Sequence, residues 1–282
     1  DGDGISDDAE VANGSDPANA CDPMQAPGYT GYDASNTTWA AADCDGDGTP
    51  NGDEVTNGSD PYLVEDSDGD GIPDYIENAA TNIGDGNNDG TPDYLQSNVA
   101  SMHDATGSSY VTVEITGECS QLNTVKVVTD TDIGQTDGNK TYPYGSVAIT
   151  LNCLTPGESA GMRVYWHGLQ DPSDYVFRKF APTAPGLMDH QYLDYPHTAT
   201  VEMIDGNNVA RYDYTLTDGA FGDHTIVDSV IIDPAGPSIE ANNVGNAPFN
   251  IPSTNIWALL VLGLAFMWQV SRHPQLKKIK IK

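Results

Sequence analysis

Residues 66–77 read Asp66-Ser67-Asp68-Gly69-Asp70-Gly71-Ile72-Pro73-Asp74-Tyr75-Ile76-Glu77, and this stretch decides how the N-terminal part of the chain folds. Side-chain oxygens stand at positions 1, 3, 5, 9 and 12, glycine stands at position 6, and position 7 offers its backbone carbonyl. That spacing lets one loop surround a hard cation that takes about 6 to 8 oxygen ligands. The stretch therefore predicts a calcium loop with the ligands Asp66, Asp68, Asp70, Ile72, Asp74 and Glu77.

Three further copies keep this spacing. In the first copy Asp1 stands at position 3, so the residue for position 1 would precede the chain. The chain also begins without an initiator Met or a signal peptide. We therefore expect a longer precursor whose export signal precedes this piece. The fourth copy has the fewest carboxylates and ends in an amide, so it should bind Ca²⁺ most weakly. The predicted ligands are Asp1, Asp3, Ile5, Asp7 and Glu10 in the first copy, Asp43, Asp45, Asp47, Thr49, Asn51 and Glu54 in the second, and Asp85, Asn87, Asp89, Thr91, Asp93 and Gln96 in the fourth.

Two other interpretations of these loops fit less well. A disordered acidic linker shares the composition, but it would not place glycine at position 6 in every copy. Mg²⁺ prefers fewer protein ligands and a strict octahedral geometry, so Ca²⁺ is the better match. Residues 1–100 contain no Lys or Arg, so their carboxylates would repel one another without bound cations. We therefore expect metal binding and folding of this region to be one event.

The loops follow one another too closely for paired EF-hands, which need a helix on both sides of each loop. Their spacing, the Asp-x-Asp-Gly-Asp-Gly starts and the Glu-Val-x-Asn-Gly-Ser-Asp-Pro tails at 10–17 and 54–61 resemble thrombospondin type 3 repeats. The resemblance covers residues 1–99. It implies an extended, calcium-binding region with little regular structure and little hydrophobic core.

Short helical turns are expected at 73–77 and 92–96, where proline stands at the first helical position. An insert at 18–44 should be closed by a disulfide between Cys21 and Cys44, the cysteines nearest in sequence, and Cys119 should pair with Cys153. An even number of cysteines in a chain of export-type composition favours oxidised thiols. No cysteine pair has the C-x-x-C spacing typical of zinc sites.

Residues 101–238 alternate apolar and polar side chains in short runs separated by turn signals. This period is typical of half-buried antiparallel strands, and the length suits one core. The sequence therefore predicts a mostly β fold, with an antiparallel β-sandwich, jelly-roll-like, after the repeats. The clearest runs are 110–116, 122–128, 146–151, 162–166, 199–204 and 210–216.

The string from Leu216 to Pro237 contains Asp-Gly, Gly-Asp and Asp-Pro in series. It resembles the closing signature of the bacterial choice-of-anchor U domain, and the resemblance covers about residues 108–238, although His224 and Asp228 depart from the usual pattern. The acidic residues of the string have two interpretations. Asp218, Asp223 and Asp228 either form another cation site or serve tight turns between the last two strands.

The C-terminal tail differs from everything before it. After a linker at 239–250, the apolar run 256–268 precedes Arg272, Lys277, Lys278, Lys280 and Lys282, which predicts one short transmembrane helix with a cytoplasmic basic end. The segment 251–282 begins Ile-Pro-Ser-Thr, and it resembles the Ile-Pro-Thr-Leu type C-terminal sorting signals of Gram-negative bacteria. The resemblance implies envelope anchoring and a membrane sorting protease as a partner.

No catalytic motif stands out in the sequence. The histidines lack metal-ligand spacing, and there is no nucleophile elbow, P-loop or dinucleotide fingerprint, so we do not expect an enzyme. A net charge of -31 disfavours nucleic acid as a partner. The sequence thus predicts a calcium-binding, extracellular protein of the cell surface, structural or adhesive in role, whose partners include surface glycans or other surface proteins.

Two alternatives to this function remain. A carbohydrate-binding or scaffold module would use exposed aromatic side chains to stack on sugars, although a sandwich core would also use them; the candidates are Tyr165, Trp166, Tyr175, Tyr192 and Tyr195. The other alternative is the non-catalytic C-terminal part of a large exported enzyme.

Overall fold

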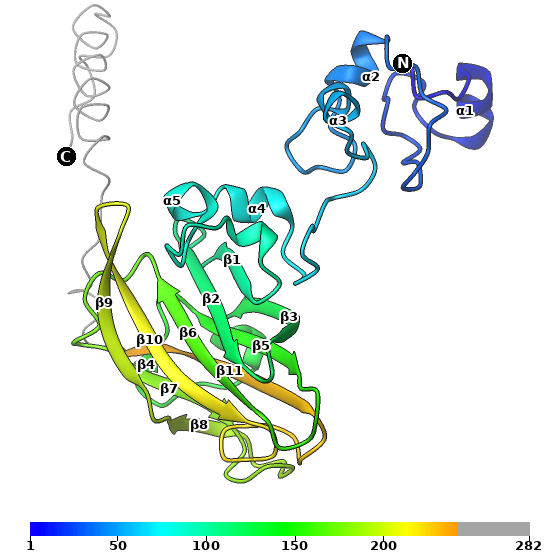
Figure 1. Cartoon of the computed structure of the whole chain (residues 1–282). Coiled ribbons are helices and arrows are strands. Elements are labelled where there is room, and N and C mark those ends of the chain that lie inside the picture. The colour runs from blue at the N-terminus through cyan, green and yellow to red at the C-terminus, as the bar shows by residue number, and fades with distance from the viewer. Residues whose placement is uncertain (242–282) are drawn as a thin grey trace, which may run out of the picture. The chain divides into compact units, whose positions relative to one another are not determined.

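The computed structural model describes residues 1–241, and its strands run from Val99 to Glu240 (Figure 1). They form two antiparallel sheets, in the orders β1-β2-β6-β10-β9 and β3-β5-β11-β7-β8, with β4 paired to β11. This confirms the mostly β, sandwich-like part of the prediction. The strands are β1 (Val99–His103), β2 (Tyr110–Gly117), β3 (Gln121–Val128), β4 (Lys140–Thr141), β5 (Ser146–Asn152), β6 (Ser159–Trp166), β7 (Val176–Ala181), β8 (Gln191–Asp194), β9 (Thr198–Ile204), β10 (Asn207–Thr217) and β11 (Val230–Glu240).

One hydrophobic core lies between the two sheets. It contains the inward side chains of β2, such as Val113, and those of β5, such as Ile149. Phe177 of β7 stacks on Tyr212 of β10 with ring centroids 5.1 Å apart, so aromatic packing joins the sheets directly. All six predicted strand ranges lie within strands, because side chains that alternate in polarity must face core and solvent in turn.

The helices are short, and four of them follow the predicted calcium loops. Helix α4 begins directly after Pro73 and the 3-10 turn η1 directly after Pro92, so each proline caps the helix instead of opening it. The helical turns expected at 73–77 and 92–96 are therefore present, shifted by one residue at the start. The elements are α1 (Asp7–Asn13), α2 (Thr37–Ala41), α3 (Asn51–Asn57), α4 (Asp74–Asn78), α5 (Thr81–Gly84), η1 (Asp93–Leu95) and α6 (Asp130–Ile133).

Both predicted disulfides are present. Cys21 bonds to Cys44, and Cys119 bonds to Cys153. The first disulfide closes the insert, and the second ties the segment between β2 and β3 to the residue after β5.

The insert contains a small aromatic core that the resemblance to thrombospondin type 3 repeats did not predict. Trp39 is fully buried; it stacks on Tyr32 at a centroid distance of 4.0 Å and donates its Nε1–H to the Tyr62 hydroxyl at 2.9 Å. The Cys21–Cys44 disulfide lies against these rings. The first two repeats therefore share an apolar cluster in addition to their carboxylate loops.

Replacing the central ring of this cluster should destabilise the first two repeats. Trp39→Ala removes a fully buried indole and is expected to cost about 3–5 kcal/mol of folding free energy. Met24→Ala is the matched control, because Met24 lies in the same insert but is 55% exposed. Thermal unfolding followed by circular dichroism and limited proteolysis would measure the difference, and equal melting curves for the two variants would contradict the prediction.

Candidate calcium sites

The four loops share one backbone turn at position 6. Gly4, Gly48, Gly71 and Gly90 all have φ between 90° and 96°, a left-handed conformation that favours glycine. In the third loop the Asp66 carboxylate at position 1 accepts hydrogen bonds from the N–H groups of Gly69 (2.9 Å) and Gly71 (3.1 Å). The Asp43 carboxylate does the same in the second loop and the Asp85 carboxylate accepts from Gly90 in the fourth, so position 1 closes the turn.

In the carboxylates at positions 3 and 5, one oxygen accepts a backbone hydrogen bond and the other has no partner. In the third loop, Asp68 Oδ1 accepts the N–H of Asp70 at 3.2 Å, and Asp70 Oδ1 accepts the N–H of Ile72 at 2.7 Å. The Oδ2 atom of each is buried and has no hydrogen-bond partner among the described residues. The same holds for Asp1 and Asp3 in the first loop. Each of these loops therefore turns free carboxylate oxygens toward its interior.

A buried glutamate stands at position 12 in the first three loops. Glu10, Glu54 and Glu77 are at most 1% exposed and lie on α1, α3 and α4, the helices that follow the loops. Both carboxylate oxygens of Glu10 and Glu54, and Oε2 of Glu77, have no partner in the described part of the chain. Burying a carboxylate without a partner is costly, so a cation fits these residues.

The pKa values of these carboxylates reflect the same cost. Burial, and then repulsion from Asp70, raises the pKa of Glu77 to about 9. Burial also raises the pKa of Asp70 and of Glu54 to about 7, with further contributions from neighbouring carboxylates. A bound divalent cation would reverse both effects, because it supplies opposite charge where hydration has been lost.

The structure brings three sets of predicted ligands together. Within each set, one ligand oxygen from each residue lies within 4.8 Å of the others. The sets are Asp1, Asp3 and Glu10; Asp43, Asp45 and Asp47; and Asp66, Asp68 and Asp70.

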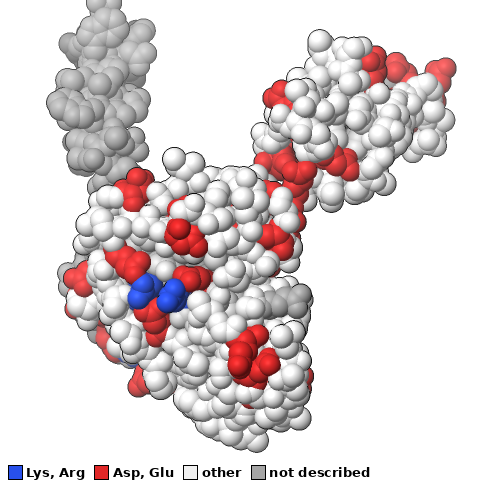
Figure 2. Space-filling model, viewed as in Figure 1, with Lys and Arg blue, Asp and Glu red and all other residues white. Residues whose placement is uncertain are grey.

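Acidic side chains are prominent over the repeat region in Figure 2. No Asp or Glu of residues 1–99 forms an ion pair within residues 1–241. The described Lys and Arg residues, apart from Lys126, pair with carboxylates of the sandwich. The charge of the repeats is therefore left for ions from solution to compensate.

Residues at position 9 have a structural contact that the sequence did not reveal. Asn51, Asp74 and Asp93 each accept, through a side-chain oxygen, the backbone N–H of the residue at position 2, at distances of 3.0, 2.7 and 2.9 Å. These contacts tie the start of each loop to the helix that follows. Asp7, the position-9 residue of the first loop, is exposed at the start of α1. Direct ligation by position 9 stays a prediction, as does ligation by the carbonyls of Ile5, Thr49, Ile72 and Thr91.

The fourth loop differs because amide groups occupy its interior. Asn87 donates its side-chain N–H to Asp89 at 3.3 Å. Gln96 at position 12 donates to Asp89 at 3.4 Å and to the backbone carbonyl of Thr91 at 3.2 Å. These N–H groups contact oxygens at positions 5 and 7, which the calcium pattern assigns to the cation. A weak fourth site stays a prediction.

The third and fourth repeats are joined to the sandwich by a buried polar network. The backbone N–H of Ser101 on β1 donates to Glu77 Oε1 at 3.0 Å, and the Ser101 hydroxyl donates to Asp93 at 2.5 Å. That hydroxyl also bonds to Thr112 on β2, which in turn bonds to His167. Sequence reasoning missed Ser101, because no local pattern marks a contact between a repeat and a strand.

Apolar contacts strengthen this junction. Ile72, at position 7 of the third loop, is 8% exposed and belongs to the hydrophobic core of the sandwich. Ile76 of α4 packs against the same core. The third loop therefore folds against the sandwich.

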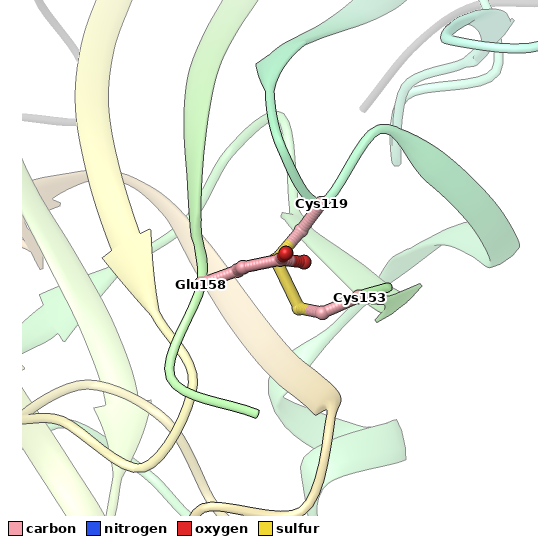
Figure 3. Close-up of side chains that lie close together, drawn as sticks. All are labelled: Cys119, Cys153 and Glu158. Atoms are coloured by element: carbon pink, nitrogen blue, oxygen red, sulfur yellow. A yellow bond between two sulfur atoms is a disulfide. The ribbon is translucent and has the colours of Figure 1, made fainter. Parts of the chain in front are cut away.

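Two other groupings are explained without a metal. Cys119, Cys153 and Glu158 lie close together (Figure 3), but the two sulfurs share a disulfide. Both carboxylate oxygens of Glu158 accept hydrogen bonds from Thr155. Neither the sulfurs nor the carboxylate is thus free to act as a ligand.

The acidic series near the end of the sandwich serves turns. Asp218 accepts the backbone N–H groups of Gly157, Asp228 and Ser229. Asp223 accepts those of Gly219, Thr225 and Ile232. Their oxygens are occupied by backbone donors, so the structure favours the turn interpretation over a further cation site.

Comparison with known families identifies the repeats. The family model for the bacterial TSP3 repeat matches residues 1–20, 43–62 and 66–82, which contain the first three loops and end before the fourth. No match was found among curated proteins or among solved structures. The three matched segments are thus similar to TSP3 repeats, a calcium-binding class of module, and together with the disulfides they fit an extracellular or surface protein.

Helices within residues 1–241 are all too short or too polar to cross a membrane. The predicted linker at 239–250 lies almost wholly, and the predicted transmembrane helix and sorting signal at 251–282 wholly, outside the described residues.

Proposed function

We propose that this protein is a calcium-binding structural or adhesion protein of the cell surface, in which the repeats form a spacer stiffened by Ca²⁺. The observation that carries the proposal is the set of buried carboxylate oxygens without partners in the first three loops. Leaving one charge of a buried pair uncompensated costs about 3–5 kcal/mol. Several such groups in one region are sustained only with bound cations.

Specific residues would hold the ion in each loop. In the third loop these are Asp68, Asp70 and Glu77, whose free oxygens are buried, together with Asp66, which lies within reach of both aspartates. Ca²⁺ would supply positive charge and bind the loop to its helix, because positions 3 and 5 lie on the loop and position 12 lies on the helix. Rigidity of the spacer follows from that cross-link.

The remaining parts of the proposal concern location and partners. We propose a non-catalytic role, anchoring in the envelope of a Gram-negative bacterium through 251–282, processing by a sorting protease, and contacts with surface glycans or proteins. The aromatic side chains give little support to sugar stacking in the sandwich, since Trp166 and Tyr195 are buried in its core and Tyr165 is buried in a separate small cluster. A structural or adhesive role is therefore preferred over a carbohydrate-binding module.

Deleting residues 251–282 tests the anchor. The truncated chain should move from the membrane fraction to the soluble or secreted fraction, while its calcium binding stays unchanged. Replacing Pro252 alone with Ala separates anchoring from cleavage, because it alters the motif and leaves the apolar run intact. Equal membrane association of the full and truncated chains would refute the anchor without affecting the calcium proposal.

The calcium loops should differ in affinity. Asp70→Ala removes a fully buried carboxylate from the third loop, whereas Asp89→Ala removes one that already accepts hydrogen bonds from Asn87 and Gln96. We expect Asp70→Ala to weaken calcium binding by tenfold or more, about 1.4 kcal/mol, and Asp89→Ala to have a much smaller effect. Calorimetric titration of the full chain measures both, and equal losses would indicate a cooperative array instead of separate sites.

A further inference from the structure

Lys179 and Asp233 occupy positions where the sandwich elsewhere places apolar side chains. On β7, Lys179 lies on the inward face between Phe177 and Ala181, both buried. On β11, Asp233 lies on the inward face between Ile231 and Ala235. Lys179 pairs in register with Ala235, so Asp233 is its diagonal neighbour on the adjacent strand.

Both side chains are fully buried and in direct contact. The Lys179 ammonium nitrogen Nζ donates to Asp233 Oδ1, and both side chains have 0% exposure. Nζ also lies 5.4 Å from the centre of the Tyr195 ring. The other ion pairs of the described residues keep at least one partly exposed member, so this pair differs from them in its environment.

As an ion pair, this contact is poorly satisfied. An ammonium has three donors and a carboxylate accepts about four hydrogen bonds, yet among residues 1–241 Nζ makes no second hydrogen bond and Asp233 Oδ2 makes none. The Tyr214 hydroxyl lies beside the carboxyl group. A buried ion pair is stable only when further hydrogen bonds satisfy both groups. A covalent amide has a single N–H and a single carbonyl, which matches the few partners available.

We propose that the side chains of Lys179 and Asp233 are joined by an intramolecular isopeptide bond. The ammonium first transfers a proton to the carboxylate, which gives a neutral amine and a neutral carboxylic acid. The lone pair of Nζ then attacks Cγ of Asp233, the N–C bond forms, and a C–O bond breaks. The departing oxygen leaves as water, with one hydrogen from the carboxylic acid and one from the amine, so no oxidant or cofactor is required.

The surroundings favour this condensation. Burial lowers the pKa of Lys179, since the ammonium loses its hydration, and this increases the fraction of neutral amine. Burial, followed by the nearby Asp233 carboxylate, raises the pKa of Tyr214 well above its usual range, so its hydroxyl stays protonated beside that carboxyl group. Tyr214 is thus placed to stabilise developing charge on the Asp233 oxygen. Exclusion of water also favours amide formation over hydrolysis.

Mass spectrometry of the intact chain tests the proposal. After complete reduction and alkylation of both disulfides, the chain is expected to weigh one water molecule less than the mass calculated for its sequence with all four cysteines alkylated. Trypsin should then fail to cleave after Lys179, and a cross-linked species should join residues 179–211 to residues 212–272. A full mass with a free 180–211 peptide would overturn the proposal, as would a loss of water that maps to another position.

Variants locate the bond and separate it from a structural role. Lys179→Met should restore the full mass, and Asp233→Asn should release ammonia instead of water if it still reacts. Lys140→Met is the matched control, because the Lys140 to Glu240 pair joins β4 to the same strand β11 but is partly exposed, and it should leave the cross-link unchanged. Tyr214→Phe should slow formation of the bond in freshly refolded chain. The measurement on the unaltered chain decides the proposal even where a variant fails to fold.

Discussion

Chelation of calcium is expected to unfold the first two repeats and open the third, making residues before Val99 at least about tenfold more sensitive to protease. The reason is that Glu10, Glu54 and Glu77 would be buried without compensating charge. Each such group costs about 3–5 kcal/mol. Apart from the Trp39 cluster, the first two repeats have no other sizeable apolar core to offset that cost.

The sandwich should respond in a graded manner to the same treatment. Its central strands have their own core and a disulfide, so β2, β5, β6, β10 and β11 should stay folded. Edge strand β1 should loosen, because the N–H of Ser101 donates to Glu77 and Ile72 joins the core beneath it. Hydrogen exchange at Ser101 should therefore increase on chelation, while exchange at Val164 on β6 should not change. Adding back Ca²⁺, but not Mg²⁺, should restore the protection of Ser101 from hydrogen exchange. If the chelator does not change the rate of proteolysis, calcium-dependent folding is refuted.

Local patterns in the sequence were sufficient for the loop turns, for six of the eleven described strands and for the cysteine pairs. The glycine at position 6 could be predicted because the turn needs a positive φ, and the strands could be predicted because polarity alternates with the pleat. Contacts between distant segments left no such pattern. Ser101 is one small polar residue of a strand, and its role depends on Glu77 lying beside β1.

Loop position 9 and residue Lys179 show what a local sequence pattern leaves out. The calcium-loop spacing predicts Asp74 as a ligand, and the structure adds that both its oxygens accept hydrogen bonds from Ser67. On β7, a lysine between Phe177 and Ala181 interrupts the apolar face, and only the neighbouring strand shows that Asp233 faces it. The partner of Asp74 is fixed by how the loop folds back on its own helix, and the partner of Lys179 is fixed by tertiary structure.

Exchanging the position-12 residues of the third and fourth loops should exchange their response to calcium. Glu77→Gln keeps an oxygen that can accept the Ser101 N–H, but it removes a charge and the bidentate carboxylate that position 12 contributes. We expect the third site to weaken by more than tenfold, and the calcium-dependent gain in melting temperature to shrink. Asp8→Asn is the matched control, since it removes one negative charge at an exposed position outside the predicted ligands.

Gln96→Glu should destabilise the fourth loop without calcium and should improve its calcium binding when the ion is present. In the absence of calcium, the new carboxylate faces Asp89 and the Thr91 carbonyl, which now accept the amide N–H, so the fourth loop should lose about 1–3 kcal/mol. With calcium present, the same carboxylate completes position 12, and titration should show one additional binding event. Ser97→Glu, which adds the same charge at an exposed neighbour, should do neither. If Gln96→Glu binds no extra calcium, the hydrogen bonds between Asn87 and Asp89 are enough to block the fourth loop. The residue at position 12 would then not decide whether a loop binds calcium.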